Sequence, residues 1–193
     1  MAGYPKIWFL RHGQTEWNKA YRLQGQLDSA LTDQGVADAR RQAALMGPIL
    51  AQDPAVFVSP LGRTRQTAEI ALSGAAYVLD DRLMEIHAGR WQGRLRSDIL
   101  ADHPEWAARN PSALEIYQKA EEGEGLEAFR ARIVSFLDDL KGPSVIVAHG
   151  LLGQVLRGHI RSLDMTQAGD LSNDQGCVYV LEDGQETVLT RSE

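Results

Sequence analysis

Three short apolar runs stand out along the chain; the first and third are followed at once by polar or charged residues, and the second leads into Pro60. They span residues 6–10 (KIWFL), 55–59 (AVFVS) and 144–148 (SVIVA). Short runs rich in β-branched and aromatic residues are typical of strands that are buried on both faces of a sheet. We therefore predict three central strands at these positions.

Between these runs, the apolar residues recur at helical spacing. Residues 32–50 place Val36, Ala39 and Met46 on one face, with Thr32 as the expected N-cap, and residues 64–72 and 126–140 also have helical patterns. Strands that alternate with helices predict an α/β fold with a mainly parallel sheet. Residues 177–181 and 186–190, separated by an Asp-Gly turn, predict a hairpin that adds an antiparallel edge.

The ends of the predicted strands carry the candidate chemistry. Arg11 and His12 follow the first strand, Arg63 comes shortly after the second, and His149 follows the third. In an open parallel sheet, ligands bind where the carboxyl ends of the strands meet the N-termini of helices. These side chains are therefore expected to form one locally positive pocket for an anion.

Composition narrows the class of protein. The chain has 193 residues, 44% of them hydrophobic, which is enough for one substantial core and predicts a single domain over residues 1–193. A net charge of −6 argues against a broad basic surface, so we expect no nucleic acid and no membrane as partner, but a small anionic substrate. Either a monomer or a homodimer is compatible with the sequence.

The lone cysteine and the N-terminus indicate where the protein resides. Cys177 cannot form an internal disulfide, and its apolar surroundings predict a buried thiol. The apolar run at residues 7–10 is too short for a signal-peptide core or a membrane span. A cytoplasmic location is the expectation.

The first strand end lies in the run LRHGQTEWN, which surrounds His12. Gly13 is expected to let the backbone approach a ligand closely, and Thr15 and Asn18 are expected to open a helix whose free amides favour an anion. This run resembles the signature of the histidine phosphatase superfamily, also called phosphoglycerate mutase-like. The resemblance continues through RLQG at 22–25, SPLGRTRQTA at 59–68, LMEIHAGRWQG at 83–93 and VAHGLLG at 147–153.

The resemblance implies one three-layer α/β/α domain and a role for each strand-end residue. By this likeness His12 is the nucleophile, Arg11 and Arg63 clamp the phosphate, His149 is a further phosphate ligand, and Glu85 is the proton donor. Attack requires a neutral His12 whose other ring nitrogen donates to a backbone carbonyl, whereas His149 is expected as a charged donor. Further substrate contacts are expected from Asn18, Thr15, Gln24, Gly25 and Gly150.

Other polar residues receive simpler assignments. His87, His103 and His159 match no catalytic position, so solvated or locally hydrogen-bonded roles are expected for them. No pair of histidines or carboxylates has zinc spacing, and no GxxxxGK[ST] loop is present, so neither metal nor cofactor is expected. The least regular stretch, residues 92–125, is expected to be a lid over the site or a surface excursion. Arg94, Arg96, Trp106 and Tyr117 in it could contact substrate or cover the core.

Departures from the family pattern bear on the reaction. Mutases typically continue after the proton donor with arginine and then tyrosine, whereas Ile86, His87 and Ala88 follow Glu85 here, which resembles the phosphatase branch. Gly125 stands where many members carry serine. We therefore expect a metal-independent phosphomonoesterase that hydrolyses a small phosphorylated metabolite through a phosphohistidine. The alternatives are a cofactor-dependent phosphoglycerate mutase and a non-catalytic module that binds phosphorylated ligands.

Overall fold

A computed structural model describes residues 3–107, 109 and 111–191, whose strands form one six-stranded sheet. The strand order is β3-β2-β4-β1-β5-β6. The strands β3, β2, β4 and β1 are parallel, β5 pairs antiparallel with β1, and β6 pairs antiparallel with β5. The strands are β1 (Ile7–Arg11), β2 (Ala55–Val58), β3 (Val78–Leu79), β4 (Ser144–Ala148), β5 (Val178–Glu182) and β6 (Gln185–Leu189).

The three predicted central strands are confirmed as β1, β2 and β4, and the predicted hairpin is confirmed as β5 and β6. Strand β3 was not predicted. Its two residues, Val78 and Leu79, are both exposed at the edge of the sheet, so no buried face imposes a pattern on them.

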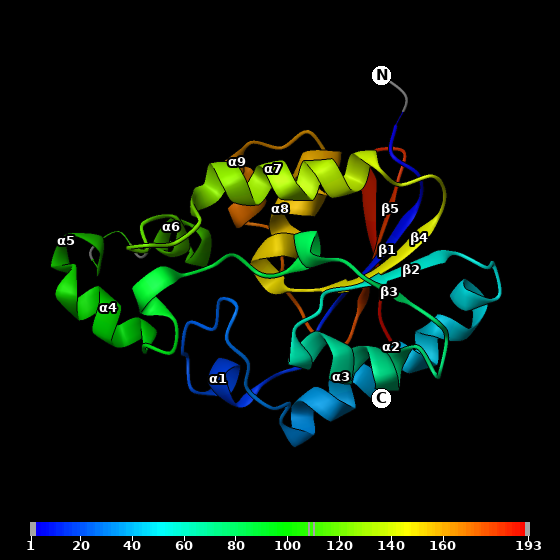
Figure 1. Cartoon of the computed structure of the whole chain (residues 1–193), viewed down its shortest axis with the longest axis horizontal. Helices are drawn as coiled ribbons and strands as arrows, with labels where there is room; N and C mark the ends of the chain where they lie inside the picture. Colours follow the sequence, from blue (N-terminus) through cyan, green and yellow to red (C-terminus); the bar gives the residue numbers. More distant parts are fainter. Residues whose placement is uncertain (1–2, 108, 110, 192–193) are drawn as a thin grey trace.

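Alternate side chains of the strands enter two different cores, which makes the fold three-layered. In β1, Ile7 and Phe9 pack with α7 (Gly125–Asp138) and α8 (Gly150–Ile160). The intervening β1 residues, Trp8 and Leu10, pack on the other face with the helices α2 (Asp33–Leu50) and α3 (Gly62–Ala71). Figure 1 shows the two helical layers on opposite sides of the strands. The α/β fold with a mainly parallel sheet is thus confirmed.

The predicted helices α2, α3 and α7 are present with ends shifted by at most two residues. Thr32 caps α2 as expected, since its side chain accepts a hydrogen bond from the Gly35 amide. Short elements complete the frame: α1 (Glu16–Lys19), η1 (Asp81–Leu83), η2 (Gly89–Trp91) and α9 (Met165–Gly169).

Residues 92–125, the least regular stretch in the sequence, contain three short helices that its pattern did not predict. They are α4 (Arg96–Asp102), α5 (Pro104–Ala107) and α6 (Ala113–Gln118). Each helix is only a few residues long, and a separate apolar cluster stabilises the segment through tertiary packing. The buried members of this cluster are Leu23, Trp91, Ile99 and Ile116. Figure 1 shows α4, α5 and α6 together at one end of the molecule, beyond α1 and α7.

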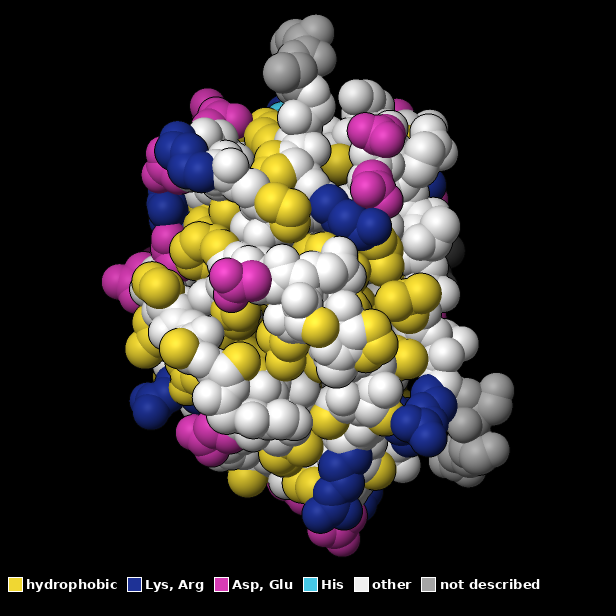
Figure 2. Space-filling view, turned by 90° about the vertical axis from the view of Figure 1, so that its right-hand side faces the viewer, with side chains coloured by type: hydrophobic (Ala, Val, Ile, Leu, Met, Phe, Trp, Pro, Cys, Tyr) yellow, Lys and Arg dark blue, Asp and Glu magenta, His cyan; other side chains and the backbone are white. Residues whose placement is uncertain are grey.

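One face of the molecule has a surface of mixed chemical character. Figure 2 shows one face on which the coloured Lys and Arg side chains are scattered among acidic and hydrophobic ones. Cys177 is buried, as predicted. Within the described ranges, no helix has both the length and the apolar character that crossing a bilayer requires.

Candidate active site

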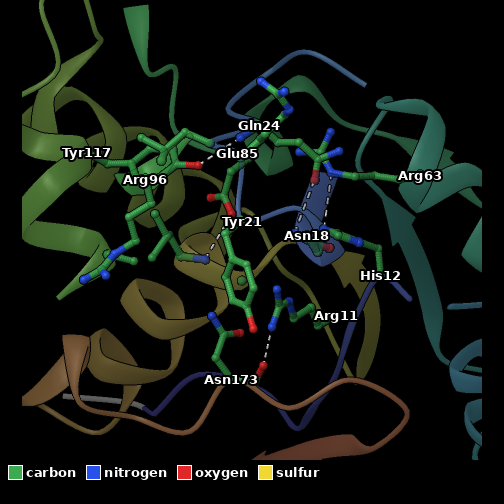
Figure 3. Close-up of a pocket in the computed structure, with 15 residues that line it drawn as sticks. Arg11, His12, Asn18, Tyr21, Gln24, Arg63, Glu85, Arg96, Tyr117 and Asn173 are labelled. Atoms are coloured by element: carbon green, nitrogen blue, oxygen red, sulfur yellow. Dashed lines mark hydrogen bonds between the residues drawn. The ribbon is translucent and has the colours of Figure 1, made fainter. Parts of the chain in front are cut away.

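The carboxyl ends of three neighbouring strands converge on one pocket. The His12 amide donates to the Ala148 carbonyl, and the Ser59 amide donates to the Val147 carbonyl, both at 3.0 Å. These bonds continue the sheet ladder by one residue and hold the ends of β1, β2 and β4 together. The predicted meeting of Arg11, His12 and Arg63 follows from this arrangement, and Figure 3 shows the three side chains in one pocket.

His12 is held in the form that a nucleophile needs. Its Nδ1 lies 2.8 Å from the Gly13 carbonyl, which can only accept, so Nδ1 carries the proton and Nε2 has a free lone pair. Burial, followed by the charges of Arg63 and Arg11, holds the pKa of His12 well below its usual value. A neutral ring with a fixed tautomer results, as expected from the sequence.

Arg63 is buried and almost fully engaged by the protein. Its Nη1 donates to the Leu27 carbonyl and to Asp28 at 2.9 Å, and its Nη2 donates to the Gly25 carbonyl at 2.8 Å. Its Nε donates to His12 Nε2 at 3.2 Å. Nε is therefore the donor closest to the reacting nitrogen, and a bound phosphoryl group can take its hydrogen bond over from His12.

Arg11 and His149 each present a buried nitrogen without a hydrogen-bond partner among the described residues. These atoms are Arg11 Nε and His149 Nδ1. Arg11 Nη1 donates to the Asn173 carbonyl, while His149 Nε2 lies 2.7 Å from the Ser59 hydroxyl. An unsatisfied buried polar group costs about 1–3 kcal/mol, and Arg11 Nε can only donate, so its lack of a partner indicates a ligand that accepts hydrogen bonds.

The charge expected on His149 is not what the structure favours. Burial lowers the pKa of His149 well below its usual value, with the charges of Arg63 and His12 acting in the same direction. The ring is therefore neutral. If the Ser59 hydroxyl donates to Nε2, the ring proton lies on Nδ1, so His149 still donates a hydrogen bond without adding a charge.

Glu85 lies across the N-terminus of α8, which follows His149 directly. Its Oε1 accepts from the amides of Ile86 and Leu152, and its Oε2 accepts from the Leu151 amide. Burial raises the pKa of Glu85, while the charge of Arg63 and these three amides oppose the rise. Because Oε2 accepts only one of the bonds, it is the oxygen with room for a proton.

Arg132 on α7 holds the backbone that carries Glu85, a role that the sequence did not reveal. Its Nη2 donates to the Glu85 carbonyl at 3.0 Å and its Nη1 donates to the Arg82 carbonyl. Glu124 pairs with Arg132 at 2.8 Å and also accepts from the His87 amide. The acidic turn that includes Glu124 thus supports the segment that carries Glu85.

Three of the five expected substrate-contact residues line the pocket. Asn18, Gln24 and Gly150 do so, whereas Thr15 and Gly25 do not. Thr15 is the N-cap of α1, and its hydroxyl donates to Gln24 Oε1. Gly25 contributes instead the carbonyl that accepts from Arg63.

The anion site expected at the N-terminus of α1 is absent from the described structure. The amides of Glu16, Trp17 and Asn18 already donate to Ala30, Ser29 and Thr15. The helix N-terminus that does face the pocket is that of α8. Gly150 there allows a close approach, because a Cβ on it would lie 2.6 Å from Asn173 Nδ2 and 3.2 Å from Arg11 Nε.

Gly13 serves packing and not, as expected, the approach of a ligand. A Cβ on it would lie 2.1 Å from the Gly35 carbonyl oxygen. Its amide donates to the Thr67 hydroxyl. The glycine therefore lets the loop after His12 rest directly on the first turn of α2.

The outer wall of the pocket comes from loops and from the 92–125 segment. Of the four side chains that could contact either substrate or core, Arg96 and Tyr117 line the pocket. Arg94 pairs with Asp102, and Trp106 stacks on His103. Three other lining residues, Tyr21, Ala113 and Asn173, lie outside every motif found in the sequence, and Arg22 belongs to the RLQG run but had no expected role.

The remaining histidines have local partners, as expected. His87 Nδ1 accepts from the Gly89 amide, His103 stacks on Trp106, and His159 lies 3.0 Å from the Tyr4 hydroxyl. Within residues 3–107, 109 and 111–191, no group of three or more His, Cys, Asp or Glu side chains is arranged to hold a metal ion.

Known proteins with similar sequences and folds fall in one family. A relative from Erwinia tasmaniensis, named "Probable phosphoglycerate mutase GpmB", is 34% identical over 165 residues, which cover 82% of this chain and 75% of the relative. The structure of Bacillus stearothermophilus YhfR is similar with a TM-score of 0.78 and 27% identity over 96% of each chain.

A third neighbour shares the fold at lower sequence identity. It is an Escherichia coli protein described as a candidate alpha-ribazole-5'-P phosphatase, with a TM-score of 0.76 and 23% identity over 99% of this chain and 97% of that one. The family model for the Histidine phosphatase superfamily (branch 1) matches residues 7–191. Because that match includes every strand of the sheet together with His12 and His149, the chain belongs to the histidine phosphatase superfamily, an enzyme family of phosphatases and mutases.

Proposed function

We propose that this protein is a phosphomonoesterase in which His12 Nε2 accepts the phosphoryl group. One observation carries the proposal: the unprotonated Nε2 of His12 lies in a pocket that Arg11 also lines, and the buried nitrogens Arg11 Nε and, on the neighbouring ring, His149 Nδ1 lack partners among the described residues. A phosphoryl group supplies an electrophile for the first atom and acceptor oxygens for the other two.

In the first step, His12 Nε2 forms a bond to phosphorus while the bond from phosphorus to the leaving oxygen breaks. The proton on Glu85 Oε2 moves to that oxygen, so an alcohol departs. Nδ1 keeps its proton and its bond to the Gly13 carbonyl. Arg63 Nε turns from Nε2 to a phosphoryl oxygen, and Arg11 stabilises the growing negative charge.

In the second step, water attacks the phosphohistidine. Glu85, now a carboxylate, accepts a proton from that water, the bond between nitrogen and phosphorus breaks, and inorganic phosphate leaves. His12 returns to its neutral form and Glu85 to its acid form. The exposed mouth of the pocket, formed in part by Tyr21 and Arg22, gives water access to the intermediate. Water access favours hydrolysis over return of the phosphoryl group to an acceptor.

The test is to trap and identify the intermediate. Rapid acid-free quenching during turnover of a ³²P-labelled phosphomonoester should yield a labelled protein whose label is stable in base and lost in acid. His12→Ala should lack the label and lose turnover by roughly 10⁴-fold or more, as nucleophile replacements do. Label on a serine, or normal turnover by His12→Ala, would contradict the proposal.

The name of the Erwinia tasmaniensis relative favours a second candidate, a phosphoglycerate mutase. The two reactions separate when 3-phosphoglycerate is supplied with a trace of 2,3-bisphosphoglycerate. A phosphatase releases inorganic phosphate faster than 2-phosphoglycerate appears, and a mutase shows the reverse order.

A further inference from the structure

Tyr21 is an aromatic side chain at the mouth of the pocket that the fold itself does not use. It lines the pocket and is 77% exposed. Among the described residues, its ring makes no aromatic or cation–π contact and its hydroxyl no hydrogen bond. Figure 3 shows the ring reaching over the pocket towards Arg11 and Asn173.

The backbone at Tyr21 is held in a conformation that suits glycine or asparagine. Its φ is 55°, in the left-handed region, which is unfavourable for a bulky side chain. Two hydrogen bonds fix it there: the Tyr21 amide donates to the Asn18 carbonyl, and the Arg96 amide donates to the Tyr21 carbonyl. Since the ring gains no packing in return, the cost indicates a functional use of the ring.

The pocket leaves room at this point for the part of the substrate beyond the phosphate. Its volume is about 210 Å³, and the phosphoryl group must lie beside His12 and Arg11 at the inner end. The leaving oxygen must face Glu85, so the rest of the leaving group extends outward, towards Tyr21. It then lies between this ring and the wall that holds Arg96 and Tyr117.

We propose that Tyr21 determines substrate specificity by stacking on a planar aromatic or heteroaromatic ring of the leaving group. The inference rests on the proposed phosphomonoesterase function and names the substrate class: phosphomonoesters of alcohols that carry such a ring. A largely exposed aromatic ring that is fixed at its backbone stacks on a planar ring better than on a puckered one of the same size.

A matched pair of substrates tests this. Benzyl phosphate and cyclohexylmethyl phosphate have leaving groups of similar size and basicity, and only the first is planar. The wild-type enzyme should favour benzyl phosphate in kcat/KM, and Tyr21→Ala should reduce this preference about three- to tenfold, the effect of one aromatic pair. Tyr21→Phe should keep the preference, and so should Val188→Ala on the distant strand β6.

Tyr21→Asn distinguishes the loss of the ring from a change in the backbone, because asparagine removes the ring and tolerates the left-handed conformation. It should lose the preference as Tyr21→Ala does. A preference that is absent from the wild-type enzyme, or that survives in both variants, would overturn the inference. If no phosphomonoester is hydrolysed, the proposed function fails. Calorimetry then tests the role of Tyr21 by itself, because the ratio of the binding constants for benzylphosphonate and cyclohexylmethylphosphonate should change between wild type and variants in the same way.

Discussion

The inner end of the pocket and its outer wall are built in opposite ways. At the inner end, the exposed fractions of His12, Arg63, Glu85 and His149 are 3, 1, 7 and 0%, and each side chain is tied to backbone or to another side chain. On the outer wall, Tyr21 is exposed and makes no such contact. The groups at the inner end are thus positioned by the packed sheet and the helices that follow its strands, whereas those of the outer wall lie on a loop and on the short helices α4 and α6.

This difference separates chemistry from selectivity. Side chains locked by burial hold the geometry that bond making requires, and loop side chains can change without disturbing it. Substitutions at the inner end should therefore lower the rate of the chemical step. Substitutions on the outer wall should change the order in which substrates are preferred.

Glu85→Gln gives the largest effect. Loss of general acid catalysis typically lowers a rate by about 10²–10⁴-fold, and the full loss is expected for an alkyl phosphate, whose alkoxide needs a proton. A nitrophenyl phosphate has a good leaving group, so its loss should be smaller and a burst of nitrophenolate should precede slow dephosphorylation. Stopped-flow absorbance measures the burst.

Equal losses for both classes of substrate without a burst would mean that Glu85 supports the fold and not proton transfer. Glu85 accepts hydrogen bonds from the first amides of α8, so a purely structural role would lower the stability of the variant. The free energy of unfolding of Glu85→Gln, measured with urea, identifies it directly.

Arg96→Ala should have a moderate effect that depends on the substrate. Its guanidinium lines the outer wall and donates to the Pro111 carbonyl, with no acidic partner in the described part of the chain. We expect KM to rise less than about tenfold for esters with a negatively charged leaving group and kcat to stay within about twofold. The matched control is Arg94→Ala, because Arg94 pairs with Asp102 outside the pocket. A fall in kcat for every substrate would place Arg96 with the inner groups.

The smallest effect concerns stability and pH. Below pH 6.5 the unfolded chain protonates His149, while the folded chain, whose pKa for this group is lower, does not. The unfolded state then binds more protons, so stability falls as pH falls through this range, by at most about 1.4 kcal/mol per pH unit for one group. Between pH 7.5 and 5.5, the free energy of unfolding of His149→Asn should fall by about 1 kcal/mol less than that of the wild type. Urea unfolding at both values measures this.

His103→Asn, outside the pocket, is the control for that measurement. An unchanged pH dependence in His149→Asn would show that the fold does not shift the pKa of this ring, and a larger loss of stability than in the wild type would show that the ring is charged in the folded protein.

The sequence predicted the inner end far better than the outer wall, for physical reasons. Strands buried on both faces leave unbroken apolar runs, so the ends of β1, β2 and β4 and the residues after them could be located. His149 is neutral because it is completely buried and lies near Arg63, and the spacing of residues along the chain shows neither of these facts. Tyr21 contradicts local preference, because sequence rules reserve left-handed positions for glycine and asparagine.

The position of Asn173 near Arg11 follows from the pairing of β5 with β1 and not from any sequence motif. The loop before β5 carries no motif, yet β5 pairs antiparallel with β1, so its first residue lies near the carboxyl end of β1. The expected hairpin, placed beside β1, would have brought this loop to Arg11. The sequence did not indicate which strand the hairpin joins.

The separate apolar cluster of Leu23, Trp91, Ile99 and Ile116 has a consequence for local unfolding of the protein. Its buried members are separate from the two cores that flank the sheet, and Tyr117 packs against both this cluster and the core on the α7 side. A region with its own small core can unfold as one cooperative unit at a lower free energy than the whole. Amide protons of α4 and α6 should therefore exchange with deuterium well before those of β1 and β4, with His12 and His149 still in place.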